Sequence, residues 1–488
     1  GANVIDSKIV YKLKLDASNN VARWKARVVA RGFQQNESEY VDSFAPMAHP
    51  VTIRTIVSVA VANGWYLRQA DVKTAYLNAE LPEPVYLAPP KGLENPKNPR
   101  QVMRLRKAVY GLAASGRLWG KLFCKRIKEF GMESLTDDET AFIVKKKGRD
   151  GKERTLVVVI VVDDCMMAGD NDEEGEELRQ EWLRHMRGFF SISDDGELKW
   201  YLGVKFDRQA DGSVKASQEA YLDRCLKRYG LQDAAPAPTP MDARFAITEN
   251  DIDENAPAEL IKEYQSLIGS LIYHSVWTAP EISLAVNMLA RYMSKPTPTL
   301  ITAAKRVFRY LKGAEHKGIY FTENDRRGFG KNVLVAYADT SDADCLITAK
   351  STGGYVLFLN GAPIAWKSGR LPLVTLSSAE SEYVEATQAC VEIIYVREIL
   401  ERMGYPQTPT VIYEDNQAAI AMSDNPVHRG RTKHIRRRYH FVRQCVREGS
   451  VLLVYVPSKK NVADCFTKPT PEDLYKYQRG ELLNVPSG

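Results

Sequence analysis

The stretch LVVVIVVDDCMMA, residues 156–168, joins two apolar runs through a pair of aspartates. Runs of this length, rich in β-branched residues, favour buried strands, and the break at Asp163 and Asp164 predicts a hairpin with both acids near its tip. A carboxylate beside a buried strand is costly unless it holds a cation or faces water. Neighbouring strand residues face opposite ways, so we expect Asp163 to be the closer ligand. An ordinary acidic turn is the alternative interpretation.

A third acid, Asp71, comes directly after a strand predicted over 65–70. Three converging carboxylates would bind hard divalent cations such as Mg²⁺ through oxygen. Two ions about 3.5–4 Å apart then serve phosphoryl transfer, one at an attacking 3′-hydroxyl and one at the leaving pyrophosphate. We therefore interpret Asp71, Asp163 and Asp164 as a candidate site for two Mg²⁺ ions, with Mn²⁺ as an alternative.

The C-terminal part of the chain repeats this arrangement of acids. Asp339 and Asp415 each follow a predicted strand, Asp464 opens a short helix after the last strand, and Glu382 lies inside a long predicted helix. The same helix holds two alternatives to Glu382, which are Glu380 and Glu385. Any one of these acids alone would be interpreted as a surface charge.

The length of 488 residues suggests two to four domains, and 44% hydrophobic with 26% charged residues is a globular composition. The longest apolar run, Leu156 to Val162, is too short to cross a membrane. Seven cysteines without a CxxC pair argue against a zinc module or a disulfide framework and favour a reducing compartment. The chain shows no signal peptide and opens with Gly1, so we expect a segment of a longer product.

The net charge of +6 is unevenly distributed. Residues 428–447 carry +8 and contain no acid, which leaves −2 for the remainder, and a second basic stretch runs from Arg23 to Arg31. Concentrated basic patches on a near-neutral body predict a polyanion partner, with two solvated basic faces as the alternative.

Local patterns divide the chain further. Strands are predicted over 8–15 and 24–31, helices over 52–63 and 115–130, a loop over 81–100, and a proline-rich linker over 233–240. A helical region without chemistry of its own follows to about residue 311. From about 332, strands alternate with helices as in an α/β domain, and the basic stretch 428–447 is predicted to be a helix.

Several of these segments, in this order, resemble the reverse transcriptase and RNase H region of copia-type (Pseudoviridae-like) LTR retrotransposons. The matching segments in the first half are LRQADVKTAYLNAELPEPVYL (67–87), VVDDCMMAG (161–169), KARVVARGFQQ (25–35), YVDSFAPMA (40–48) and LKWYLGVKF (198–206). The last resembles the primer-grip hairpin, and residues 264–297 and 303–313 resemble the thumb and connection. The resemblance implies an α+β right-hand polymerase, with fingers and palm over 1–210 and a helical thumb or connection over 211–330.

The second group of acids resembles the RNase H of the same family. Its segments are YADTSDADC (337–345), KSTGGYVLF (350–358), SSAESEYVEA (377–386), EDNQAAI (414–420), RTKHIRRRYHFVR (431–443) and NVADCFTK (461–468). The resemblance implies an α/β RNase H-like domain with a mixed five-stranded sheet over 331–475, followed by a tail over 476–488. Two Mg²⁺ ions there would activate water against an RNA phosphate.

The resemblance also implies roles for single residues. Asp71, Asp163 and Asp164 would be the polymerase ligands, and Asp339, Glu382, Asp415 and Asp464 the nuclease ligands. Tyr76 would be an aromatic gate against ribonucleotides, and the nucleotide phosphates would lie near Lys25, Arg27, Thr74 and Ala75. The RNA–DNA hybrid would contact Arg431, Lys433, His434, Arg436, Arg437, Arg438 and Arg443, although histidines in a basic helix are also common as plain surface residues.

Two departures from the family pattern affect the predicted function. Val161 replaces the usual tyrosine before the paired aspartates, and residues 113–116 lack the usual lysine and proline. The resemblance implies an RNA-directed DNA polymerase with RNase H activity whose partners are an RNA template, a DNA primer, dNTPs and the hybrid. A polymerase-deficient, nucleic-acid-binding relic of the same fold is the alternative. The family implies a cytoplasmic virus-like particle, with a later nuclear stage as an alternative, and protease and integrase functions outside this segment.

Overall fold

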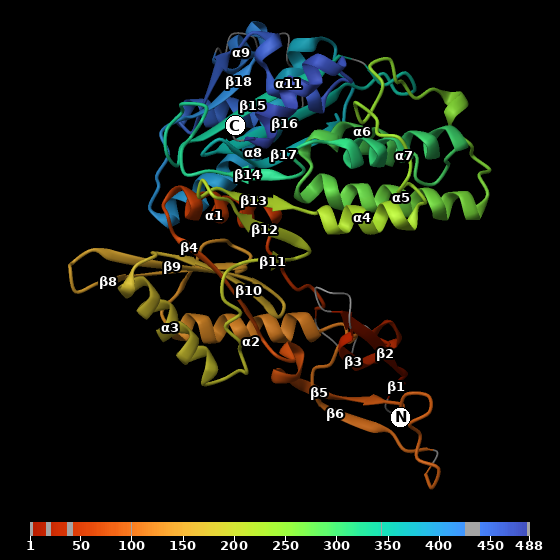
Figure 1. Cartoon of the computed structure of the whole chain (residues 1–488), viewed down its shortest axis with the longest axis vertical. Helices are drawn as coiled ribbons and strands as arrows, with labels where there is room; N and C mark the ends of the chain where they lie inside the picture. The colour runs from red at the N-terminus through yellow and green to blue at the C-terminus, as the bar shows by residue number, and fades with distance from the viewer. Residues whose placement is uncertain are drawn as a thin grey trace. The chain divides into compact units, whose positions relative to one another are not determined.

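The computed structural model describes residues 3–15, 21–36, 42–98, 100–342, 344–424 and 440–485. The chain divides into two compact units (Figure 1). Unit 1 comprises residues 1–48 and 66–197, and unit 2 comprises residues 49–65 and 198–488. In the described part of the chain, no helix combines the length and the apolar character that a membrane span requires.

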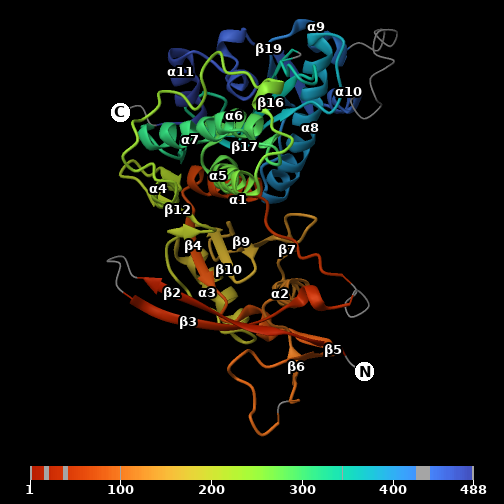
Figure 2. The same cartoon turned by 90° about the vertical axis from the view of Figure 1, so that its right-hand side faces the viewer.

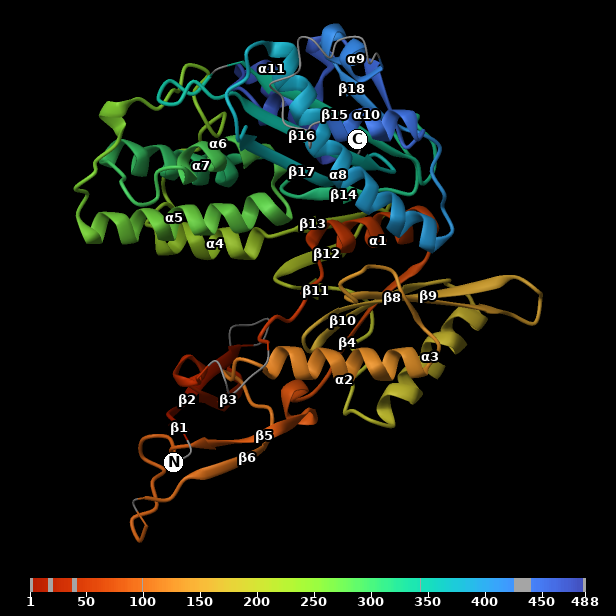
Figure 3. The same cartoon turned by 180° about the vertical axis from the view of Figure 1, so that it is seen from behind.

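Unit 1 is built on a five-stranded antiparallel sheet. Its strands, in spatial order, are β4 (Tyr66–Asp71), β10 (Asp164–Gly169), β9 (Glu153–Val161), β8 (Ala141–Lys147) and β7 (Glu133–Ser134). One face packs on α2 (Ser115–Glu129) and α3 (Glu173–Arg187) through Trp119, Phe123 and Trp182 (Figure 3). The predicted hairpin over 156–168 is thus two central strands, which explains its uninterrupted apolar pattern.

Two smaller sheets complete unit 1. One joins β1 (Val4–Ile5), β5 (Glu80–Leu87) and β6 (Met103–Lys107), and the other is a ribbon of β2 (Ser7–Leu15) and β3 (Val21–Ala30) (Figure 2). The short helices are η1 (Gly32–Gln34) and η3 (Ala75–Asn78). The loop predicted over 81–100 is therefore wrong over its first seven residues. Pro82 and Pro84 lie where the β5–β6 register shifts, and a strand tolerates proline at such an irregularity.

Unit 2 contains a helical region and a four-stranded sheet. The sheet order is β11 (Trp200–Tyr201), β12 (Val204–Arg208), β13 (Val214–Ser217) and β14 (Ile319–Phe321). The helices are α4 (Glu219–Arg228), η4 (Glu249–Asp251), α5 (Ala258–Trp277), η5 (Pro280–Ile282), α6 (Ser283–Ala290) and α7 (Pro298–Gly313). The segment predicted as a linker, 233–240, packs on α7: the Ala237 amide donates to the Arg309 carbonyl at 3.3 Å. It is therefore part of the folded unit and not a tether.

A second five-stranded sheet forms the rest of unit 2. Its order is β17 (Ala362–Arg370), β16 (Thr352–Leu359), β15 (Leu334–Ser341), β18 (Thr410–Glu414) and β19 (Val451–Tyr455). The first two pairings are antiparallel and the last two are parallel, so the sheet is mixed. The surrounding helices are α8 (Ser378–Met403), α9 (Gln417–Asp424), α10 (Phe441–Arg447), η8 (Ser458–Lys460), η9 (Val462–Phe466) and α11 (Glu472–Leu483).

Helix α1 (Pro50–Ala62) belongs to unit 2, although it directly precedes β4 of unit 1. Its Arg54 is buried, lies 3.9 Å from the Trp366 ring centroid, and donates to the carbonyls of Ile364 and Val276, each at 2.7 Å. These contacts provide hydrogen-bond acceptors for the guanidinium N–H groups, which a charged group needs where water is excluded. The helix was predicted correctly from its local pattern, but its packing partner lies some 300 residues away in sequence.

Candidate active sites

The first candidate site lies at one end of the central sheet in unit 1. Asp71, the last residue of β4, is the direct cross-strand partner of Asp164, the first residue of β10. The Val72 amide donates to the Asp163 carbonyl at 2.8 Å, which ties the turn to the same edge. Directly paired residues share a sheet face with Cβ atoms about 5 Å apart. The fold therefore brings Asp71 to the paired aspartates, from more than 90 residues away in sequence.

The turn before these aspartates has a strained backbone. Val162 has φ 58°, and its carbonyl accepts a 2.6 Å hydrogen bond from Trp119 Nε1 on α2. Thr74, which precedes η3, has φ 54°. A β-branched residue at positive φ costs about 1–3 kcal/mol and persists where its surroundings over-determine it, often at functional sites. Trp119 thus fixes the turn that presents Asp163.

An aromatic row extends from the ribbon β2–β3 to the acids. The Arg27 guanidinium lies 4.7 Å from the Tyr110 ring centroid, and Tyr110 makes a 4.6 Å edge contact with Tyr76. Burial, and then the neighbouring charge of Asp163, raise the pKa of Tyr110. Burial, Tyr110 and Asp163 raise the pKa of Tyr76. Tyr76 and Tyr110 therefore lie close enough to Asp163 for its charge to affect both, and Arg27 lies against Tyr110.

The other predicted nucleotide-binding residues lie near this row. Lys25 is on the same face of β3 as Arg27, two residues away. Ala75 is buried and Thr74 is exposed, and their amides open η3, where a helix has no internal acceptors for its first N–H groups. The role of these amides as anion donors stays a prediction.

The two sequence departures occupy ordered positions. Val161 pairs with Asp164 and is buried on the same face of the sheet. The Ala113 amide donates to Gln35 Oε1 at 2.9 Å, and a Cβ on Gly116 would lie 2.9 Å from the Ala45 Cβ. Segment 113–116 is therefore closely packed despite lacking the family's lysine and proline.

The second candidate site gathers three acids more tightly. One carboxylate oxygen from each of Asp339, Glu382 and Asp415 lies within 4.8 Å of the others. Among the described residues, this is the one group of three acidic, histidine or cysteine side chains that meets this spacing. Asp339 is on the central strand β15, Asp415 follows β18, and Glu382 comes from α8, which packs on β15 and β16. Figure 2 shows α8 beside this sheet.

The structure separates Glu382 from its two alternatives on α8. Glu380 accepts a 2.9 Å hydrogen bond from the Leu376 amide at the start of the helix. Glu385 points at β16, where a Cβ on Gly353 would lie 2.2 Å from its Oε2. Glu382 is thus the glutamate that joins Asp339 and Asp415.

Asp464 lies beside the trio on η9. Its carboxylate pairs with Lys468 Nζ at 2.8 Å. The hydroxyl of Thr467 donates to Asp339 Oδ2, and Asn461 Nδ2 donates to the Ala338 carbonyl at 2.8 Å. These two bonds dock η9 on β15. The fourth predicted acid therefore lies close to the trio, with Lys468 as its immediate partner.

The concentration of buried negative charge in this cluster favours binding of a cation. Burial, offset by Lys468 and reinforced by neighbouring acids, raises the pKa of Asp339 to about 7. Burial and the charges of Glu414 and Asp339 raise the pKa of Glu382 well above its usual value. Buried Glu382 Oε2 has no hydrogen-bond partner among the described residues. Buried carboxylates held this close together are stabilised by a hard cation such as Mg²⁺ or Mn²⁺.

Glu414 is a member of this cluster that our sequence analysis missed. It is fully buried, its Oε1 accepts from the Asn416 amide at 3.1 Å, and burial raises its pKa well above the usual value. Strand β18 alternates buried and half-buried residues, which places Glu414 on the inner face. An acid at an inward position of an alternating strand was the available signal.

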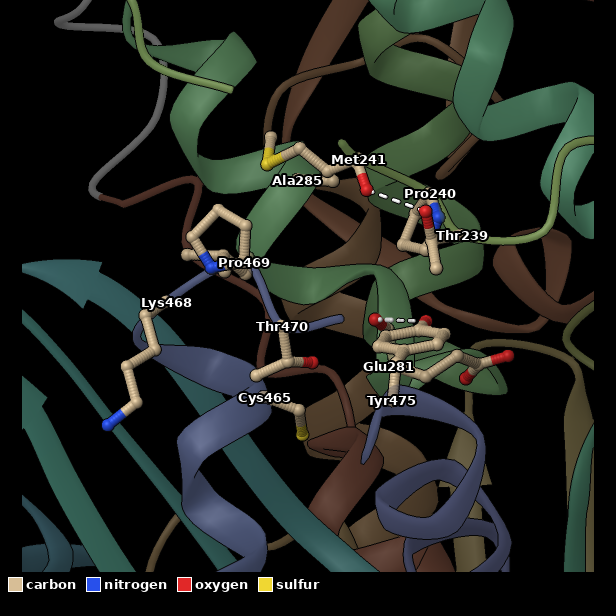
Figure 4. Close-up of a pocket in the computed structure, with 11 residues that line it drawn as sticks. Thr239, Pro240, Met241, Glu281, Ala285, Cys465, Lys468, Pro469, Thr470 and Tyr475 are labelled. Carbon is tan, nitrogen blue, oxygen red and sulfur yellow. Dashed lines mark hydrogen bonds between the residues drawn. The ribbon is translucent and has the colours of Figure 1, made fainter. Parts of the chain in front are cut away.

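A small hollow behind η9 does not serve as a substrate site. Its volume is about 20 Å³, enough for one water molecule, and Cys465, Tyr475 and Glu281 line it (Figure 4). Lys468 and the Glu281 carboxylate extend in opposite directions from this hollow (Figure 4). The Tyr475 hydroxyl donates to the Glu281 carbonyl at 3.0 Å. The residues around this hollow thus join η9 to the helical region, whereas Lys468 forms an ion pair with Asp464.

The predicted nucleic-acid contacts are only partly described. Six of them lie outside the described residues: Arg431, Lys433, His434, Arg436, Arg437 and Arg438. Of the predicted basic helix, the structure describes α10. Arg443 is a correction, because it is 7% exposed and its Nη2 donates to the Met422 carbonyl at 2.8 Å. Its guanidinium braces α9 against α10 and does not face solvent.

Comparisons with known proteins support one family. The reverse transcriptase (RNA-dependent DNA polymerase) family matches residues 1–243. The whole chain is 30% identical over 493 residues to the retrovirus-related Pol polyprotein from transposon TNT 1-94 of Nicotiana tabacum. It is 31% identical to the Pol polyproteins from transposons RE1 and RE2 of Arabidopsis thaliana, with 97% and 96% of the chain aligned. The chain spans 36%, 31% and 31% of the three polyproteins. The chain therefore belongs to the reverse transcriptases of copia-type LTR retrotransposons.

Proposed function

We propose that unit 1 carries an RNA-directed DNA polymerase site. The observation that supports it best is the pairing of Asp71 with Asp164 beside Asp163, within the segment that matches the reverse transcriptase family. These three carboxylates would hold two Mg²⁺ ions, which when bound would activate a primer 3′-hydroxyl and stabilise the leaving pyrophosphate. The strained turn held by Trp119 would keep Asp163 at the site.

The residues around these acids would bind and select the nucleotide. Arg27 and Lys25 would pair with the triphosphate, and the amides of Thr74 and Ala75 would donate to it. Tyr76, held by its contact with Tyr110, would collide with a ribose 2′-hydroxyl. This arrangement selects dNTPs over ribonucleotides.

We further propose that unit 2 cleaves the RNA strand of an RNA–DNA hybrid. The three buried carboxylates of Asp339, Glu382 and Asp415 within 4.8 Å support this assignment. Two Mg²⁺ ions, when bound, would activate water for attack on the phosphate. Asp464 would be the fourth ligand, and Lys468 would hold Asp464 in place and offset part of the negative charge.

The family also suggests a layout for the chain. We propose fingers and palm over 1–210, a helical thumb or connection over 211–330 and an RNase H-like domain from 331. The boundary expected at 475 falls inside α11 (Glu472–Leu483), and Leu482 of this helix is buried in the same core as Val335 and Phe358, so α11 is part of this domain and not of a tail. The mixed sheet order β17-β16-β15-β18-β19 supports the third part. The basic segment 428–447 would bind the hybrid, and a virus-like particle in the cytoplasm would be the setting.

Primer extension tests the polymerase proposal. The full chain should extend a DNA primer on an RNA template with dNTPs and Mg²⁺, and Asp163→Asn should lose the activity. The exposed strand acid Glu133 offers a matched control, and Glu133→Gln should retain it. No extension above the Asp163→Asn level by a folded wild-type chain would reject the proposal.

The alternative function, a polymerase-deficient relic, is favoured by Val161 and by segment 113–116. Cleavage of a labelled hybrid discriminates the two, because a relic can bind the hybrid without reacting. The wild type should cut the RNA strand with Mg²⁺, Asp415→Asn should not, and Glu398→Gln, on the exposed side of α8, should behave as wild type. Tight hybrid binding with neither reaction would establish the relic.

A further inference from the structure

A larger cavity in unit 2 lies outside both candidate active sites. Its volume is about 330 Å³, and parts of β15, β18, η8, η9 and α11 line it, together with the loop before β15. None of the four acids proposed as nuclease ligands lines it. A volume of this size is typical of a pocket for one small molecule, whereas the hollow behind η9 holds a single water molecule.

Two lysines give this cavity a positive charge. Lys459 and Lys460 are the last residues of η8, both are exposed, and neither has an ion-pair partner among the described residues. The third cation of the lining, Arg327, pairs with Glu481 at 3.5 Å, and Glu481 is the one acid among the described residues that line the cavity. The lining therefore carries three positive charges against one negative charge, which favours an anion.

Three tyrosines line the same cavity. Tyr337 on β15 and Tyr413 on β18 are cross-strand partners, and their rings stack with centroids 4.8 Å apart and 28° between the planes. Tyr477 comes from α11 and is 54% exposed. The faces of aromatic rings bind flat groups such as nucleobases, because every base has a π-face that can stack.

Two buried donors in the lining residues lack acceptors. Gln478 is 1% exposed, its Oε1 accepts a 3.5 Å hydrogen bond from the Thr470 hydroxyl, and its Nε2 has no partner among the described residues. The Nε of Arg327 is also without a partner in this part of the chain. Unsatisfied buried donors are rare in folded proteins, and a bound group with oxygen or ring-nitrogen acceptors would satisfy them.

We propose that this cavity binds a 5′-phosphorylated nucleoside, with the phosphate on Lys459 and Lys460 and the base against Tyr413 and Tyr477. Such a ligand combines the two chemistries that the lining residues accept, a compact anion and a flat ring. A carboxylate metabolite would leave the rings without a partner, and an uncharged nucleoside would leave the lysines without one. The nucleotide is either free or the first residue of an RNA fragment, and the proposal depends on neither of the reactions proposed above.

Isothermal titration calorimetry of the full chain with AMP, in EDTA, tests the proposal independently of metal ions and catalysis. Adenosine or inorganic phosphate alone should bind at least tenfold more weakly than AMP. Tyr477→Ala should weaken AMP binding about fivefold or more, since stacking of a base on an aromatic ring contributes that much. Lys459→Ala and Lys460→Ala should each weaken it about fivefold and make the affinity less dependent on salt, because each removes one charge pair with the phosphate.

The 5′-phosphorylated dinucleotide pApA identifies the source of the ligand. An affinity equal to that of AMP would assign the cavity to the end of an RNA fragment, and weaker binding would assign it to the free nucleotide. Both results support the proposal, because the shared chemistry is the same.

Matched variants separate this cavity from the rest of the chain. Lys476 lies on the same helix as Tyr477, pairs with Glu472 at 2.6 Å and does not line the cavity, so Lys476→Ala should bind AMP as wild type does. Tyr477→Phe keeps the ring and should retain most of the affinity. AMP binding that Lys25→Ala weakens and Lys459→Ala does not would assign the nucleotide to the candidate polymerase site and overturn the proposal. Absence of AMP binding by the folded chain, or binding of inorganic phosphate as tightly as AMP, would overturn it as well.

Discussion

Asp339→Asn should stabilise the metal-free protein while abolishing cleavage of the hybrid. Asp339 is 2% exposed, and its pKa is raised from 3.8 to about 7, chiefly by burial. The folded chain therefore holds this proton more tightly than the unfolded chain does. Stability falls as pH rises from about 4 to about 7 and stays reduced above that window.

The expected size of this stabilisation follows from the difference in the pKa of Asp339 between the unfolded and the folded chain. The difference between a pKa of 3.8 and one of about 7 corresponds to about 4 kcal/mol in the free energy of unfolding at pH 8. At this pH the folded wild type must ionise a buried carboxylate, and the asparagine amide avoids that cost. At pH 5 the same substitution should raise the free energy of unfolding by only about 1.5 kcal/mol. Magnesium should shrink the difference at pH 8, because a cation that binds the folded wild type stabilises it.

Urea unfolding followed by tryptophan fluorescence, in EDTA and in Mg²⁺, measures these values. Glu398→Gln on the exposed side of α8 is the matched control and should change the free energy of unfolding at neither pH. If Asp339→Asn were less stable than wild type at pH 8 in EDTA, or if its gain were the same at pH 5, the buried-charge account would be wrong.

Three further predictions concern other parts of the chain. Burial lowers the pKa of His274 from 6.5 to about 4, so the folded chain favours the neutral imidazole. About 3 kcal/mol of the free energy of unfolding should therefore be lost as pH falls from 6.5 to 4. In urea unfolding, His274→Gln should reduce this dependence on pH. A Cβ on Gly354 would lie 2.3 Å from the Phe466 Cβ, so Gly354→Ala should displace η9 and reduce hybrid cleavage at least tenfold. Gly369→Ala is the control and should leave cleavage unchanged, because the atom nearest to its new Cβ would be 3.5 Å away. Tyr76→Val should raise ribonucleotide incorporation in primer extension at least tenfold, and unchanged selectivity would remove Tyr76 from the gate.

Much of the architecture could be predicted because the strands leave strong local patterns. The uninterrupted run before Asp163 reflects a strand that is buried at most positions, and the acids after it lie where that strand ends. The same logic placed Asp415, which follows β18, whereas Asp339 lies inside the neighbouring strand β15, which continues to Ser341. Acids that lie opposite each other on adjacent strands come close together, however long the sequence between them.

The features that were predicted wrongly or overlooked depend on contacts between residues that are far apart in sequence. The helical pattern of α1 does not say that Arg54 would dock on Ile364 and Trp366. Prolines in 81–100 suggested a loop, but a strand accepts them where its register shifts. Glu414 was overlooked because a buried acid without an opposite charge is unusual, and its neighbours Glu382 and Asp339 are distant in sequence.

The central claim is that two separate groups of acids support two separate reactions. Asp71→Asn and Asp339→Asn, assayed side by side for primer extension and for cleavage of the RNA strand on one hybrid substrate, test it most directly. Asp71→Asn should lose extension and retain cleavage, and Asp339→Asn should do the reverse. Loss of both reactions in either folded variant, or of neither, would contradict the account.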